Sequence, residues 1–217
     1  MDRLITVKAK AKVSVKVDLV IINMILESHK LDYDEMMELA TNSVDKITSA
    51  IESVGFDKKD LKTTSFNVRT HYENYRDEEN NYKSKFDGYV CEQGLNLEFD
   101  FDSNLMSKVL TAITNTNANP KLNIQFSIKD KVGVNEELLI QATKNAKSTA
   151  KILAESSNVD LGKLVKIDYN LDQLNLYSPT MYDVENRAMV KEMSFSPTIE
   201  PEDINVSDTV TFIWEIK

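Results

Sequence analysis

The sequence predicts an α+β protein built on antiparallel sheet, with one long N-terminal strand, two long helices and one short helix. Residues 5–17 alternate between apolar and polar side chains, which indicates a long strand with one wet face. An antiparallel sheet tolerates such a face, whereas a parallel sheet covered by helices does not. Residues 32–54 and 135–157 instead carry apolar side chains at helical spacing.

The first long helix has sequence signals at both of its ends. It follows an expected second strand over residues 19–28. Asp32 is a typical N-cap residue with Glu35 three positions later, and Gly55 is a typical terminating residue. A helix over residues 32–54 is therefore expected.

The middle of the chain predicts a hairpin, a short helix and a further strand. The hairpin strands are expected over residues 61–75 and 88–101, joined by a long polar loop. Asp102 or Ser103 then caps the short helix, and residues 122–128 form the next strand. The order β-α-β-β-α-β from residue 19 onward is compatible with a ferredoxin-like unit.

The last third predicts a long helix and two strands separated by an excursion. Asn135 is expected to cap the helix, and the strands are expected over residues 163–171 and 205–216. Residues 172–204 show no clear element, and their apolar content indicates a partner-contact or flexible segment. The candidate contact residues in it are Met181, Tyr182, Met189, Met193 and Phe195.

The length predicts one domain over residues 1–217, or two small lobes. The 26 Lys and Arg against 35 Asp and Glu give a net charge of −9, which disfavours nucleic-acid binding. The exception is a row of lysines on the wet face of the first strand. They either guard the strand against stray pairing or meet an anionic partner or the acidic face of a sister subunit. These lysines are Lys8, Lys10, Lys12 and Lys16.

No segment is expected to span a membrane. The most apolar run, residues 19–26, is far shorter than the roughly 20 residues that a bilayer helix needs. The N-terminus lacks the apolar region and the cleavage site of a signal peptide. We therefore expect a soluble cytoplasmic chain as given, and a periplasmic or extracellular one if a leader was removed.

The residue types that carry chemistry are sparse. The single cysteine, Cys91, excludes an internal disulfide and lies on the apolar face of its expected strand. Neither histidine has a partner at zinc-ligand spacing, and no Gly-rich phosphate-binding motif is present. We therefore expect no catalytic residue, no bound metal, no cofactor and no enzymatic activity.

One alternative places a small-molecule site or a hydrolytic site near the hairpin tip, residues 71–87. Its polar candidates are His71, Asp77, Glu78 and Glu79. Aromatic side chains gather in the same region, and cross-strand packing accounts for them without a ligand. They are Tyr72, Tyr75, Tyr82, Phe86 and Tyr89.

A set of short motifs runs in order along nearly the whole chain. They are the alternating residues 5–15 with Asp18-Leu19, Gly55 with residues 59–63, Gly88-Tyr89, the alanines at 142, 146, 150 and 154, residues 161–164, residues 199–202 and residues 210–212. In the order and spacing of these motifs the chain resembles the SIMPL-domain family, which includes bacterial periplasmic immunogenic proteins. Leu139 and Gln93 stand where the family usually has Arg and Asn.

This resemblance implies an α+β protein that is often exported and has no established catalytic residues. It also implies ring-like or channel-like homo-oligomers and, for some members, a link to oxidative-stress tolerance. Together with the residues, it predicts a non-enzymatic, self-associating scaffold or binding protein.

Overall fold

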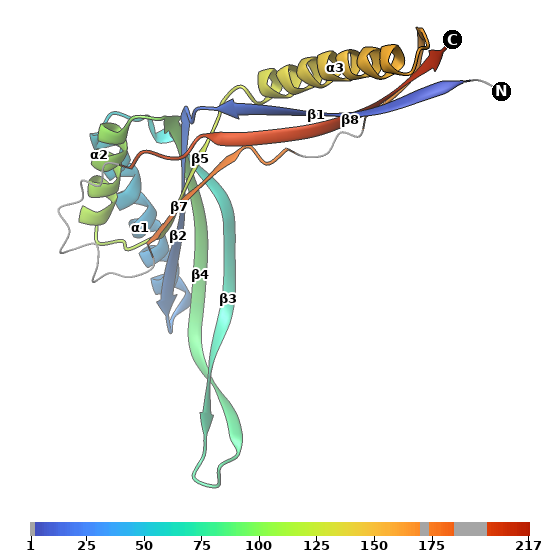
Figure 1. Ribbon diagram of the computed structural model, residues 1–217. Coiled ribbons are helices and arrows are strands. Elements are labelled where there is room, and N and C mark those ends of the chain that lie inside the picture. The colour runs from blue at the N-terminus through green and yellow to red at the C-terminus, as the bar shows by residue number, and fades with distance from the viewer. Residues whose placement is uncertain (1–2, 170–173, 185–198) are drawn as a thin grey trace. The chain divides into compact units, whose positions relative to one another are not determined.

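The structure is a computed structural model that describes residues 3–169, 174–184 and 199–217 (Figure 1). The described strands form two sheets, of order β1-β8-β6 and β3-β4-β2-β5-β7. The chain order is β1 (Leu4–Val15), β2 (Leu19–Lys30), α1 (Tyr33–Ser53), a 3-10 turn (Lys58–Asp60), β3 (Leu61–Arg76), β4 (Tyr82–Asp100), α2 (Ser103–Asn115), β5 (Lys121–Ser127), α3 (Lys131–Ser156), β6 (Leu161–Asp168), β7 (Tyr177–Val184) and β8 (Ile204–Ile216). The predicted α+β class with antiparallel pairing is confirmed.

The chain divides into two compact units. Unit 1 consists of residues 1–17, 127–179 and 202–217, and unit 2 consists of residues 18–126 and 180–201. Whether they act as one SIMPL-like domain over residues 1–217 stays a prediction.

Unit 1 joins the first and last strands of the chain. β1 pairs with β8 from Leu4 opposite Glu215 to Val15 opposite Ile204. The odd-numbered side chains of β1, as the alternation predicts, lie in one core with even-numbered side chains of β8 beneath α3. The helix approaches the sheet closely because its buried stripe consists mainly of alanine. The stripe comprises Val134, Leu138, Ala142, Ala146, Ala150 and Ala154.

The start of α3 differs from the prediction. Its N-cap is Asp130, whose carboxylate accepts a hydrogen bond from the Gly133 amide at 2.8 Å, and Asn135 lies inside the helix. A Cβ on Gly133 would overlap the Asp130 carboxylate, so glycine leaves room for this cap. The C-terminus agrees with expectation, since Asn158 adopts the left-handed conformation with φ 56°.

Unit 2 has the strand order of a ferredoxin-like unit. Within its sheet the order β3-β4-β2-β5 is that of a ferredoxin-like unit, with which the β-α-β-β-α-β succession in the sequence was compatible. Asp32 caps α1 through hydrogen bonds from the Asp34 and Glu35 amides, and Asp102 caps α2. Both helices lie on the same side of the sheet (Figure 1), and α1 contacts β2 and β4.

Two expectations about loops were wrong. Residues 82–87 belong to β4, which pairs with β3 up to Arg76 opposite Tyr82, so the polar loop is short. β7 lies inside the segment 172–204, where the sequence showed no clear element and only a candidate short helix over residues 182–193, and it contains Pro179. Proline is tolerated there because β7 is the last strand of its sheet.

Candidate functional site on the β3–β4 hairpin

The hairpin of β3 and β4 is exposed along most of β3 and at the start of β4. β2 pairs with β4 only as far as Lys30 opposite Tyr89, so the hairpin continues beyond this point as two strands. Figure 1 shows that its end extends past β2 and α1. β3 is the last strand of its sheet, and it exposes apolar side chains such as Phe66, at 54%.

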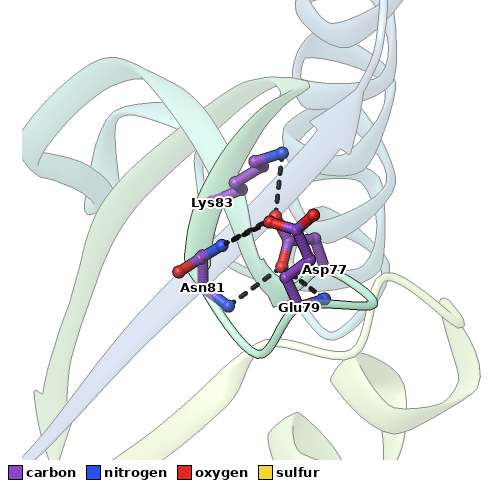
Figure 2. A network of polar contacts seen from close by, with 4 residues as sticks. All are labelled: Asp77, Glu79, Asn81 and Lys83. Atoms are coloured by element: carbon purple, nitrogen blue, oxygen red, sulfur yellow. Dashed lines mark hydrogen bonds and ion pairs between the residues drawn. The ribbon is translucent and has the colours of Figure 1, made fainter.

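The hairpin turn is closed by one carboxylate (Figure 2). Asp77 accepts hydrogen bonds from the backbone amides of Glu79, at 3.0 Å, and Asn81, at 2.9 Å. Its second oxygen lies 2.9 Å from the Lys83 ammonium. The Lys83 contact, followed by the Asn81 amide, lowers the pKa of Asp77 below its ordinary value of 3.8. Asn80 completes the turn with a positive φ of 65°.

The two histidines of the chain meet on the sheet face opposite the helices. His29 Nε2 lies 2.6 Å from the Asp87 carbonyl oxygen and 3.5 Å from Asp87 Oδ2. His71 Nε2 lies 3.7 Å from the same Oδ2, and the two rings are 5.3 Å apart. Such a contact becomes an ion pair when a histidine is protonated. All three side chains are well exposed, so the group is open to solvent.

A bulge aims Asp87 at the histidines. The pairing of β3 with β4 shifts between His71, opposite Gly88, and Tyr72, opposite Phe86, which leaves Asp87 as the extra residue. Gly88 makes this possible with φ +110° and a close approach to β2. A Cβ at Gly88 would lie 2.8 Å from the Leu31 Cα and would overlap the Lys30 carbonyl.

Aromatic side chains form a connected row along the hairpin. Ring centroids are 5.7 Å apart for Tyr72 and Phe86, 5.4 Å for Phe86 and Tyr89, and 5.4 Å for Tyr89 and Tyr33. Cross-strand packing therefore accounts for part of the predicted cluster, and the row is joined by Tyr33, which the prediction did not include. Tyr82 does not join this row. The guanidinium carbon of Arg76 lies over its ring, 4.4 Å from the ring centroid. Tyr75 is exposed and pairs with Lys83 in the ladder.

The structure separates His71 from the other predicted polar candidates of the tip, Asp77, Glu78 and Glu79. His71 precedes Asp77 by six residues along an extended strand, a separation of about 20 Å at the usual rise per residue. Asp77 and Glu79 belong to the turn, and Glu78 is exposed there. The partners that His71 does have, His29 and Asp87, were missed, although the hairpin register could have indicated them.

The predicted lysine row lies on β1. Lys8, Lys10 and Lys12 are exposed and face away from α3, opposite the β8 residues Thr211, Thr209 and Ser207. Lys16 is exposed just after the strand ends. Within the described ranges none of the four forms an ion pair, so the row is open to an anionic group.

The other candidate contact residues are only partly described. Met181 lies in β7 and is 60% exposed. The backbone of Tyr182 belongs to β7, and its side chain lies outside the described part. Met189, Met193 and Phe195 lie outside the described residues.

Cys91 is placed as predicted, on the buried side of β4. It packs with Met36 and Ala40 of α1 and is 1% exposed. Burial, aided by the neighbouring Glu92 carboxylate, raises the pKa of the Cys91 thiol. In the ranges that the structure describes, no three His, Cys, Asp or Glu side chains are arranged to hold a metal ion.

A shallow groove of about 550 Å³ lies between α1 and α2. Its lining is mostly small, including Ala50, Ser53 and Ala112, and Lys108 is its charged residue. Its other polar residues are the uncharged Ser53, Ser107, Thr111 and Asn115. None of the described helices is both long enough and apolar enough to cross a bilayer.

Comparison with known proteins gives the family. The model of the SIMPL family, described as a protein of unknown function (DUF541), matches residues 5–214. The chain belongs to the SIMPL family. It is 25% identical over 164 residues to the 26 kDa periplasmic immunogenic protein of Brucella melitensis biotype 1, and 24% identical to the protein of the same name in Brucella abortus (strain S19). Each match covers 75% of this chain and 65% of the relative, which is less than two thirds of the relative's length.

Proposed function

We propose that this SIMPL protein is a non-enzymatic, self-associating scaffold or binding module. The observation that carries the proposal is the exposed edge of β3, a strand of 16 residues at the end of its sheet. A strand edge presents unpaired backbone amides and carbonyls, which readily accept another strand. Exposed aromatic rings on the same hairpin add apolar surface of the kind that partners cover.

The placement of the reactive side chains supports a role without catalysis. Cys91 is buried, and Asp77 is engaged in closing a turn. The family description as a protein of unknown function leaves the question of catalysis open.

Light scattering coupled to size exclusion tests self-association across a concentration series. We expect masses that are multiples of 24.7 kDa and that rise with concentration. A clean 24.7 kDa species at high concentration contradicts the proposal. Met181→Ser tests the excursion over residues 172–204 as a second contact surface, because the Met181 side chain is exposed and lies outside the buried core.

The names of the relatives support a location for the protein. Both are periplasmic proteins by name, so we propose a periplasmic rather than a cytoplasmic site of action for this chain as well. Fractionation of the native host, with detection of the protein in the periplasmic extract, tests this. A stress-related role rests on the family resemblance alone and stays a prediction.

A second candidate function is small-molecule binding at His29, His71 and Asp87. The convergence of both histidines on one exposed carboxylate favours it. Melting shifts with a panel of small acids and bases test this role, with His71→Ala as the disrupting variant. Glu78→Ala is the matched control, since Glu78 lies at the hairpin turn away from the histidines. If each ligand shifts the melting temperature of His71→Ala and of Glu78→Ala equally, binding at His29, His71 and Asp87 is excluded.

A further inference from the structure

The four sheet edges of the described chain differ in how well they are protected. β1 carries the lysine row, and Asn145 of α3 donates a hydrogen bond to its Lys10 carbonyl. β6 is short and has two register shifts against β8, and β7 contains Pro179. Charges, irregularity and proline are the usual devices against edge pairing. β3, with 16 residues, is the longest of the four. Its pairing with β4 also shifts twice, but the extra residue of the shift at His71 and Tyr72 is Asp87 of β4, so every residue of β3 from Ser65 to Arg76 remains paired in succession.

The charges along this run are self-complementary. Suppose that β3 pairs with β3 of a second copy, antiparallel, so that the two sheets become one. Residues directly opposite each other then point to the same face of the sheet, so both have odd numbers or both have even numbers. Two identical strands that pair in this way are related by a two-fold axis. If the axis passed through Arg69, the two copies of Arg69 would lie opposite each other, and an axis through Glu73 would do the same for Glu73. An axis at His71 instead places Arg69 of each copy opposite Glu73 of the other.

We propose that two copies of this chain pair through β3, antiparallel and with His71 on the two-fold axis. The proposal rests on the proposed self-association and names its interface and register. Arg69 and Glu73 are both exposed, so each is available to the second copy. Arg69 contacts Glu92 within its own chain at 3.2 Å, which holds the guanidinium on the correct face of the sheet.

Charge exchange tests the register. Glu73→Arg places arginines opposite each other twice per dimer, and we expect it to raise the dimer dissociation constant about tenfold, as like charges directly opposite destabilise strand pairs. Arg69→Glu is expected to weaken association similarly. The double variant R69E/E73R restores opposite charges, so its dissociation constant should return toward the wild-type value. Sedimentation equilibrium of the full chain measures all four proteins.

Cross-linking tests the axis. In a Cys91→Ala background, His71→Cys places two thiols directly opposite, where antiparallel Cα separations of about 4.5–5.5 Å suit a disulfide. We expect a covalent dimer on mild oxidation. Asn67→Cys is the matched control on the same face, because its counterpart in the second copy would be about 26 Å away along the strands.

The outcomes separate this inference from the proposed function. If the wild-type chain associates but the charge exchange has no effect and the His71→Cys variant does not cross-link, the β3 register is wrong while self-association stands. If the wild-type chain remains a monomer at every concentration, both proposals fail.

Discussion

The Asp77 carboxylate lies 2.9 Å from the Lys83 ammonium and also accepts two backbone amides of its own turn. One side chain thus fixes the end of a hairpin that no other described strand supports.

Replacing Asp77 should loosen the turn. Asp77→Asn removes the charge that attracts Lys83 and weakens the acceptor for the Asn81 amide, so this amide should exchange its hydrogen faster. Amide hydrogen exchange measures the effect, with Glu78→Gln as a control at a neighbouring exposed carboxylate. Equal exchange in both variants would contradict the role of Asp77.

The same contact predicts a pH dependence. The pKa of Asp77 is lower in the folded turn than its ordinary value of 3.8. Its stabilising contribution is therefore fully present above the unfolded pKa, at about pH 5 and higher, and is lost as the pH falls through the lowered folded value. Protection of the Asn81 amide should decline in acid below about pH 4 in the wild type and stay flat in Asp77→Asn, each relative to intrinsic exchange.

Gly88 should be intolerant of a side chain. Gly88→Ala forces a positive φ on alanine, which costs roughly 1–3 kcal/mol, and adds a collision with β2. The denaturant midpoint from circular dichroism should fall. Gly55→Ala is the matched control, because Gly55 has a similar φ of +104° but nothing within 4 Å of its added Cβ. If the denaturant midpoint of Gly88→Ala were as high as that of Gly55→Ala, the backbone of β2 would have moved away from the added Cβ at little energetic cost.

The alanine stripe of α3 should not accept larger residues. Ala150→Leu inserts extra atoms into the packed layer between α3 and β1 and should cost about 1–3 kcal/mol. Fluorescence of Trp214, the single tryptophan, reports unfolding of unit 1 because this side chain is 7% exposed in the same core. Ser148→Leu, on the exposed side of α3, should leave the midpoint nearly unchanged. An equally small effect of Ala150→Leu would mean that the layer is loosely packed.

Cys91 should react slowly with thiol reagents. Its thiol is buried and its pKa is raised, so little thiolate is present at about pH 8. Alkylation followed by mass spectrometry should show slow labelling in buffer and rapid labelling in urea. Fast labelling in buffer would indicate frequent opening of the contact with α1.

The elements with strong periodicity were predictable from the sequence, because burial on one face dictates the pattern directly. β1 and α1 are examples, since their buried positions repeat every second residue and at helical spacing respectively. The start of α3 was harder to place. Asp130 and Asn135 are both good N-cap residues, and the glycine that favours the earlier start is also a weak helix former.

The candidate site was less predictable because it depends on register between distant segments. His29 and His71 are far apart in the sequence, and neither has a local partner that would identify it. Only the pairing of β4 with both β2 and β3, together with the bulge at Asp87, brings them to one carboxylate. The same applies to Tyr33, which joins the aromatic row through its place at the start of α1.

The position of β8 between β1 and β6 has a consequence for biosynthesis. β1 precedes every other described strand in the chain, yet its one partner in the sheet, β8, is the last of the described strands to be synthesised. The nascent chain therefore carries an unpaired β1 until β8 has emerged, whereas β2, β3, β4 and β5 follow one another within residues 19–127 and can pair early. Lys8, Lys10 and Lys12 give this unpaired strand a charged face, a feature that disfavours stray strand pairing.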